Sequence, residues 1–209
     1  MRRFMLSGTY ALLLLASPEA VAADKKDPDW PCVQRKVSTI SAGMIWSGPP
    51  IDNGMVSKWR SDKASKQLVA QLAARRTELE EAETLIEKFA ADLTKENRAS
   101  ELTLLFASVL HRINSERQQI MTGIERYTRK QRSLAETVRE TRDKLNAILK
   151  KGNAEGADKE KRRKLEETLN WQSRIHEERE RSLQYVCESP VLLEQRAFSI
   201  ARAIANHLP

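Results

Sequence analysis

The chain has few helix-breaking residues, and they are unevenly distributed. Proline is absent from Ile51 to Ser189, and between Met55 and Lys151 the only glycine is Gly123. Proline and glycine are the strongest local punctuation of secondary structure. Their absence over so long a polar-rich stretch predicts helix, and long helices.

Long hydrophobic runs are also scarce. The only one lies at the N-terminus, where Arg2 and Arg3 precede the apolar residues 10–16 and small residues follow at 20–23. This pattern is typical of a secretory signal peptide, cut after Ala22 or Ala23. The run is shorter than the ~20 residues of a membrane span. We therefore expect residues 1–22 to be a signal peptide, the mature chain to have no membrane span, and the protein to reside in a periplasm.

Cysteine occurs only twice, as Cys32 and Cys187, and no C-x-x-C redox pair is present. In an oxidising compartment two lone cysteines are expected to pair with each other. The two alternatives are a reactive thiol and a disulfide-linked dimer. We predict an intramolecular disulfide that ties the start of the mature chain to its far end.

Catalytic motifs are missing as well. No G-x-S-x-G, P-loop, Rossmann glycine pattern or H-E-x-x-H is found. Of the histidines, His111 lies five residues from Glu116, which is the wrong helical spacing for a shared metal, and His176 with Glu180 gives only two ligands. We expect no enzyme activity, no metal and no cofactor.

Residues 23–56 are rich in proline, glycine and tryptophan and are predicted to form an extended arm. Trp30 and Trp46 lie in this arm, and Trp59 lies just past it. Such tryptophans can form a stacking platform for a sugar or another ligand. No polar constellation accompanies them, so we interpret them as apolar anchors that hold the arm on the rest of the chain.

Residues 57–209 are predicted to form a single helical domain. The first helix is expected at about 61–75, and a second is expected to begin at a capping box at Thr77. A third is expected from Thr94 or Asn97 to about 150. The third helix carries a heptad series at 124, 127, 131, 134, 138, 141, 145 and 148. A fourth begins near Asp158, and its apolar stripe is Leu165, Leu169, Ile175, Leu183 and Val186, widened by Trp171. Ser189 and Pro190 fit the start of a separate last helix, with Leu192, Leu193, Phe198, Ile200 and Ile204 inward.

The glycines at 152 and 156 predict a short connection, which makes the two heptad-patterned helices antiparallel neighbours. Pairing them about residue 154 places Cys187 near residue 121. The predicted fold is therefore all-α: a helical base, a long antiparallel coiled-coil hairpin at about 121–187, and an extended N-terminal arm stapled at the root of the hairpin.

Basic residues give the chain a formal net charge of +7 and gather at the predicted hairpin tip. The cluster is Lys159, Lys161, Arg162, Arg163 and Lys164. One interpretation is a docking surface for an acidic partner or membrane surface. The other is a solvated face kept soluble by charge, with glutamates interleaved for i,i+4 pairing.

These observations favour a non-enzymatic scaffold or adaptor that docks a cell-envelope partner. The alternatives are a periplasmic holding chaperone for unfolded envelope proteins and a subunit that stabilises an envelope complex. Export argues against nucleic acid as the partner. The sequence leaves open whether the chain forms an oligomer.

Overall fold

A computed structural model describes residues 27–52, 54–55, 63–152 and 156–209, and it confirms the all-α fold. The helices are α1 (Ala42–Ile45), α3 (Lys63–Ala73), α4 (Leu79–Ala91), α5 (Arg98–Leu149) and α6 (Ala157–Ala205). The predicted signal peptide 1–22 and Trp59 lie outside the described residues. None of the described helices is long and apolar enough to cross a membrane.

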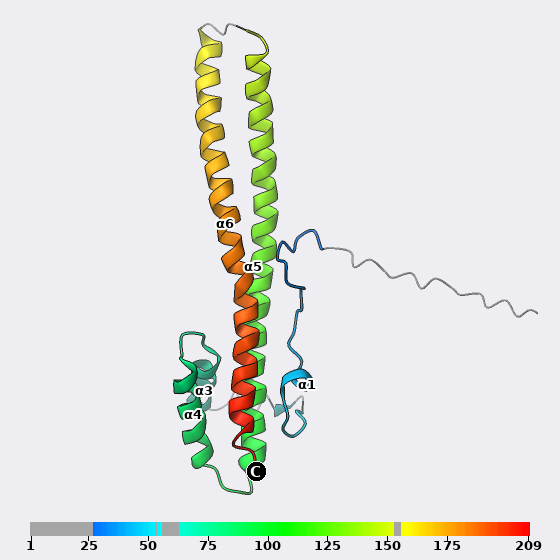
Figure 1. Cartoon of the computed structure of the whole chain (residues 1–209), viewed down its shortest axis with the longest axis vertical. Coiled ribbons are helices and arrows are strands. Elements are labelled where there is room, and N and C mark those ends of the chain that lie inside the picture. Colours follow the sequence, from blue (N-terminus) through cyan, green and yellow to red (C-terminus); the bar gives the residue numbers. More distant parts are fainter. Residues whose placement is uncertain (1–26, 53, 56–62, 153–155) are drawn as a thin grey trace, which may run out of the picture.

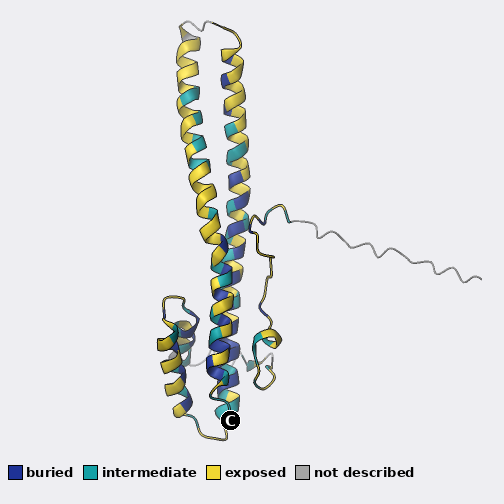
Figure 2. Ribbon diagram, viewed as in Figure 1, coloured by how far each residue is buried: buried dark blue, intermediate teal, exposed yellow. Residues whose placement is uncertain are grey.

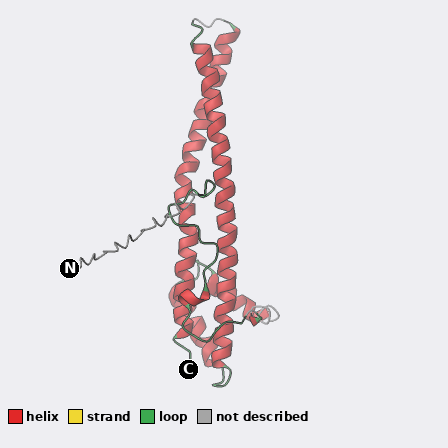
Figure 3. Ribbon diagram, turned by 90° about the vertical axis from the view of Figure 1, so that its right-hand side faces the viewer, coloured by secondary structure: helices red, strands yellow, loops and turns green. Residues whose placement is uncertain are grey.

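Helices α5 and α6 form a long antiparallel hairpin that runs the length of the molecule (Figures 1 and 3). Helix α5 contains 52 residues, which corresponds to about 78 Å at 1.5 Å per residue. Helices α3 and α4 pack beside the end of the hairpin that is remote from its tip (Figure 1). We call this end the base.

The main hydrophobic core lies in the base, and Figure 2 shows that burial concentrates there. Aliphatic side chains of α3, α4, α5 and α6 meet in one cluster, joined by Ile40 from the arm. Its fully buried large members include Leu72, Ile86, Leu102, Leu105, Phe106, Ile113, Leu193, Ile200 and Ile204. Burying a side chain of this size contributes roughly 1.5–3 kcal/mol, so the base is the principal source of stability.

The hairpin beyond the base packs through a narrower and partly polar seam. The predicted heptad positions of α5 are all buried or half-buried, but Gln131 and Thr141 are among them, and Thr128 is buried beside them. The Gln131 amide donates to the carbonyl oxygen of His176 at 3.1 Å, and the Tyr127 hydroxyl donates to that of Arg179 at 2.9 Å. Side-chain hydrogen bonds to the facing backbone therefore support the apolar contacts that hold the two helices together.

The predicted break at Ser189 and Pro190 is wrong, because α6 continues through Pro190 without interruption. Proline removes one backbone hydrogen bond from a helix interior. The buried Cys187 precedes it and the fully buried Leu193 follows it, each in a different apolar cluster. Cys187 and Leu193 reach their two clusters together only if the chain between them stays helical. Tertiary packing therefore outweighs the local preference of proline to begin a helix.

Two smaller expectations on the helices also fail. Helix α4 begins at Leu79 with Glu78 at the N-cap and no side-chain cap hydrogen bond, so the capping box at Thr77 does not form. The Thr77 side chain is buried, and its carbonyl oxygen accepts from the Arg196 guanidinium at 2.7 Å. On α6, four side chains that were predicted to face inward are exposed: Trp171, Val186, Leu192 and Phe198.

Candidate functional site

The predicted disulfide joins Cys32 of the arm to Cys187 of α6, with the two Cα atoms 5.5 Å apart. Both cysteines are buried and pack with Trp30 of the arm and with Met121 and Ile124 of α5. The bond therefore lies where the base passes into the free part of the hairpin, at the level of residue 121 as the antiparallel pairing predicted.

Ion pairs hold the arm on α5 beside the disulfide. The Asp29 carboxylate pairs with Arg129 at 2.7 Å and also with Arg132. Lys36 pairs with Asp27 at 2.7 Å and with Glu125 at 2.5 Å. The hydrogen bond from Arg129 lowers the pKa of Asp29 below its usual value, and those to Asp27 and Glu125 raise the pKa of Lys36. The carboxylate of Asp29 and the ammonium group of Lys36 are thus charged at neutral pH.

Asn114 of α5 secures the middle of the arm by pairing with the backbone of one residue. Its side-chain oxygen accepts from the Ile40 amide at 2.9 Å, and its amide donates to the Ile40 carbonyl at 3.0 Å. The Ile40 side chain enters the base core. The arm is thus held by backbone, covalent and ionic contacts along its described length.

The two described tryptophans of the arm have their rings in contact with the protein. Trp30 is buried, and its indole N–H donates to the Gln34 carbonyl at 2.7 Å. Trp46 stacks on Phe106 of α5 with ring centroids 4.3 Å apart. A Cβ placed on Gly48 would lie 2.6 Å from the indole Cε2 atom of Trp46, so the backbone also approaches that ring closely. These positions leave little room for a ligand to stack.

The five cations of the predicted docking cluster are all exposed at the start of α6, but they differ in their partners. Arg162 pairs with Glu166, Arg163 with Glu160 and Glu167, and Lys164 with Glu160. Lys159 and Lys161 make no ion pair with any described residue. The neighbouring Lys150 and Lys151, at the end of α5, are exposed and also unpaired within the described part.

The pairing at the tip is strong enough to change the titration of a carboxylate. The guanidinium of Arg163 lowers the pKa of Glu160 to about 2. Glu160 is therefore ionised at any physiological pH, and it partly neutralises the arginine face of the tip. Among the described residues of the tip, the lysines at 150, 151, 159 and 161 are cations without an ion pair, and the exposed Leu149 lies beside them.

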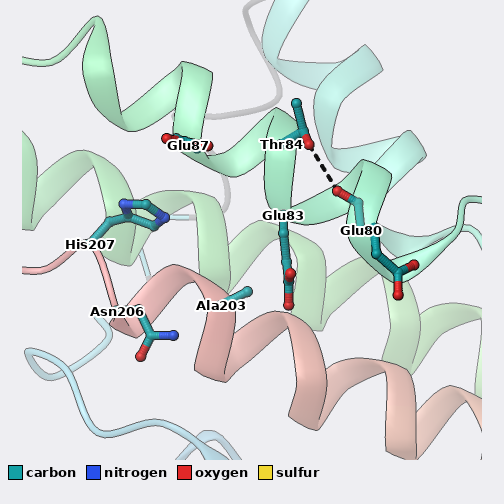
Figure 4. A pocket seen from close by; sticks show the side chains of 7 residues that line it. All are labelled: Glu80, Glu83, Thr84, Glu87, Ala203, Asn206 and His207. Carbon is teal, nitrogen blue, oxygen red and sulfur yellow. Dashed lines mark hydrogen bonds between the residues drawn. The ribbon is translucent and has the colours of Figure 1, made fainter.

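Sequence reasoning missed an acidic concavity at the base. Glu80, Glu83 and Glu87 of α4 face Ala203, Asn206 and His207 across an open hollow of about 430 Å³ (Figure 4). The i, i+3, i+7 spacing of the three glutamates was a signal that could have found it. Within the described residues, no group of three or more His, Cys, Asp or Glu side chains could hold a metal ion.

Comparison of the chain with protein-family models, with curated proteins and with solved structures gave no match.

Proposed function

We propose that this protein is a non-enzymatic adaptor of the cell envelope, exported through a cleaved signal peptide, whose hairpin tip docks an acidic surface of a protein partner. The observation that carries the proposal is a group of exposed lysines at the tip that form no ion pair with any described residue: Lys150, Lys151, Lys159 and Lys161. These charges stand at the far end of the hairpin from the base (Figure 1).

The shape of the molecule supports an adaptor. The arm is fixed on the base by a disulfide and by ion pairs, and the described helices are built around one large apolar core. A rigid base with a projecting hairpin presents a charged tip at a distance from the body. Electrostatic attraction between a basic tip and an acidic surface favours fast and salt-sensitive association.

A holding chaperone is the second candidate, because several large apolar side chains of the described part are exposed. Val33 and Met44 of the arm region and Trp171 and Tyr185 of α6 are the clearest cases. A chaperone would bind unfolded clients through apolar surface, and this binding would persist in high salt. Docking through lysines would weaken as the Debye length falls from ~10 Å at 0.1 M to ~3 Å at 1 M salt.

Photo-crosslinking in the cells that produce the protein tests the docking site. A crosslinking residue at the exposed Leu149 reports on the tip, and one at the exposed Met44 reports on the base end. We expect the tip probe to give an adduct of defined mass, which high salt in isolated envelopes prevents. Equal adducts from both positions would contradict docking through the tip.

Glutamine variants separate the two sets of cations at the tip. Replacing Lys150, Lys151, Lys159 and Lys161 should abolish the adduct while helicity stays unchanged, because exposed charges contribute little to stability. Arg162, Arg163 and Lys164 already form ion pairs with glutamates, so replacing these three residues should reduce the adduct much less. If neither set matters, the tip is a solvated cap and the adaptor proposal loses its site.

A further inference from the structure

The side of α6 that faces away from α5 carries three exposed large side chains at matched positions. Trp171 is 58% exposed, Tyr185 74% and Leu192 46%. They are separated by 14 and 7 residues, which places them within an arc of roughly 60° at 100° per residue. The side chains turned toward α5 in this stretch, such as His176 and Cys187, lie on roughly the opposite side of the helix.

Four charged residues lie between these side chains on the same face. They are Arg174, Glu178, Arg181 and Glu188, all exposed. None of them forms an ion pair with a described residue, although charged residues earlier in α6 pair readily at i,i+3 and i,i+4. We call this set the outer seam; in chain order it is Trp171, Arg174, Glu178, Arg181, Tyr185, Glu188 and Leu192.

The outer seam complements itself when its order is reversed. With a two-fold axis near Arg181 and Ser182, Trp171 of one copy faces Leu192 of the other, and Arg174 faces Glu188. Glu178 faces Tyr185, whose hydroxyl can donate to the carboxylate. The midpoint of the two residue numbers in each pair falls within one residue of the axis. A single antiparallel register therefore satisfies all of the pairs.

The residues at the axis fit the same register. The two Arg181 side chains come close there, and each lies within a turn of Glu178 of the other copy, which offsets their repulsion. A parallel arrangement would instead set Arg174 against Arg174 and Glu178 against Glu178, which is unfavourable. The charge order therefore selects the antiparallel arrangement.

We propose that the outer seam is a homodimer interface, in which the α6 helices of two copies pair antiparallel about a two-fold axis near residue 181. The spacing by seven residues is that of a left-handed coiled coil, and closed two-fold pairing through one self-complementary surface is the commonest form of protein assembly. Trp, Tyr and Arg are the residue types that dominate binding energy at interfaces. From 171 to 192 the seam extends over about 32 Å. The interface is independent of the proposed docking at the tip.

A charge exchange tests the register. Sedimentation equilibrium of the oxidised mature protein should show a monomer–dimer equilibrium. Arg174→Glu should weaken the dimer about tenfold or more, because each copy then places a glutamate against Glu188 of the other. Glu188→Arg should do the same, and the Arg174→Glu, Glu188→Arg double variant should recover wild-type affinity. Circular dichroism should show equal helicity in all four proteins.

Apolar substitution gives the second arm of the test. Tyr185→Ala should weaken the dimer, whereas Phe198→Ala should not, since Phe198 is also an exposed aromatic residue but points to another side of α6. Ser182→Cys should form a disulfide-linked dimer under oxidation because it lies near the axis. Ser133→Cys, on the exposed side of α5, is the control that should remain monomeric.

A monomer at every concentration would overturn the proposal. A dimer that ignores both single charge reversals would also overturn it, and would assign dimerisation to another surface. Weakening by each single variant without recovery in the double variant would exclude the antiparallel register. None of these outcomes affects crosslinking from Leu149, so the two proposals fail separately.

Discussion

Arg117 of α5 donates from its guanidinium Nε to the carbonyl oxygen of Pro190 in α6, at 3.1 Å. The Arg117 side chain is 3% exposed, its Nη1 atom has no hydrogen-bond partner among the described residues, and its Nη2 atom lies 3.8 Å from a carboxylate oxygen of Glu194. Burial lowers the pKa of Arg117 accordingly. A buried cation thus holds the backbone of α6 at the one proline inside that helix.

Substitutions at Arg117 should separate packing from charge. Arg117→Ala should destabilise the protein by about 3 kcal/mol, because it leaves a cavity and removes the hydrogen bond from the guanidinium to the Pro190 carbonyl. Arg117→Met fills most of the volume and removes a desolvated charge, so it should cost less than half as much. Urea unfolding of both variants measures the difference. Equal losses would show that the hydrogen bond, and not the volume, determines the effect.

Much of the fold could be predicted from the sequence, because the signals were long and repeated. The heptad series of α5 and the glycines at 152 and 156 gave the hairpin and its pairing. That pairing placed Cys187 beside residue 121, where Met121 and Cys187 share a cluster. Single local signals for the start of a helix were less reliable. Pro190 and Thr77 each predicted a helix start. Both residues are buried, and an arginine of another helix donates a hydrogen bond to the carbonyl oxygen of each.

The contacts of the candidate sites were harder to predict. The sequence placed five cations at the tip, but it did not show which of them pair with glutamates and which make no ion pair with a described residue, since that depends on rotamers. The outer seam was missed because Trp171 was assigned to the packed side. Trp171 was expected to widen the apolar stripe of α6, but it lies on the outer side of the helix and is exposed.

The disulfide between Cys32 and Cys187 should leave no free thiol in the oxidised monomer. Its sequence separation is 155 residues, and a loop of that length stabilises by ~5 kcal/mol in the chain-entropy model. Reduction should therefore lower the melting temperature while the helical signal at room temperature largely persists, since the base core does not depend on the bond. Thiol counting on denatured, unreduced protein checks the pairing. Two reactive thiols per chain, or a ladder of dimers on a non-reducing gel, would contradict it.

The ion pair of Asp29 makes the docking of the arm sensitive to acid. Its pKa is lowered from 3.8, so its contribution to stability is present above that pH and declines as the pH falls below it. Lys36, with a raised pKa, loses its contribution only above pH 10.5. Protease cleavage within residues 27–36 should thus stay constant between pH 5 and 8, as judged with an acid-tolerant and a neutral protease. In wild type, cleavage should increase as the pH falls below 3.8. Asp29→Asn should increase cleavage at neutral pH and make the further increase in acid smaller, because Asp27, which pairs with Lys36, still titrates. A dependence on pH as large as in wild type would assign the effect to another carboxylate.

Two glycines provide a matched pair of alanine substitutions with opposite expected effects. At Gly48 a Cβ would lie 2.7 Å from the Leu208 Cδ1 atom and against the Trp46 indole. Gly48→Ala must therefore displace the ring that stacks on Phe106, and it should destabilise the protein by about 1–3 kcal/mol. At Gly123, inside α5, a Cβ would meet nothing within 4 Å. Gly123→Ala should stabilise by about 1 kcal/mol, because alanine favours the helix interior.

Thermal and urea unfolding of the two variants measure both effects, and the fluorescence of Trp46 reports the cause of the first. A shift in tryptophan emission should accompany Gly48→Ala and be absent in Gly123→Ala. The variant Trp46→Phe provides the control, since a smaller ring gives the new methyl group room. Gly48→Ala should then cost clearly less in the Trp46→Phe background than in the wild type. An equal cost in both backgrounds would assign the strain to Leu208 rather than to the indole.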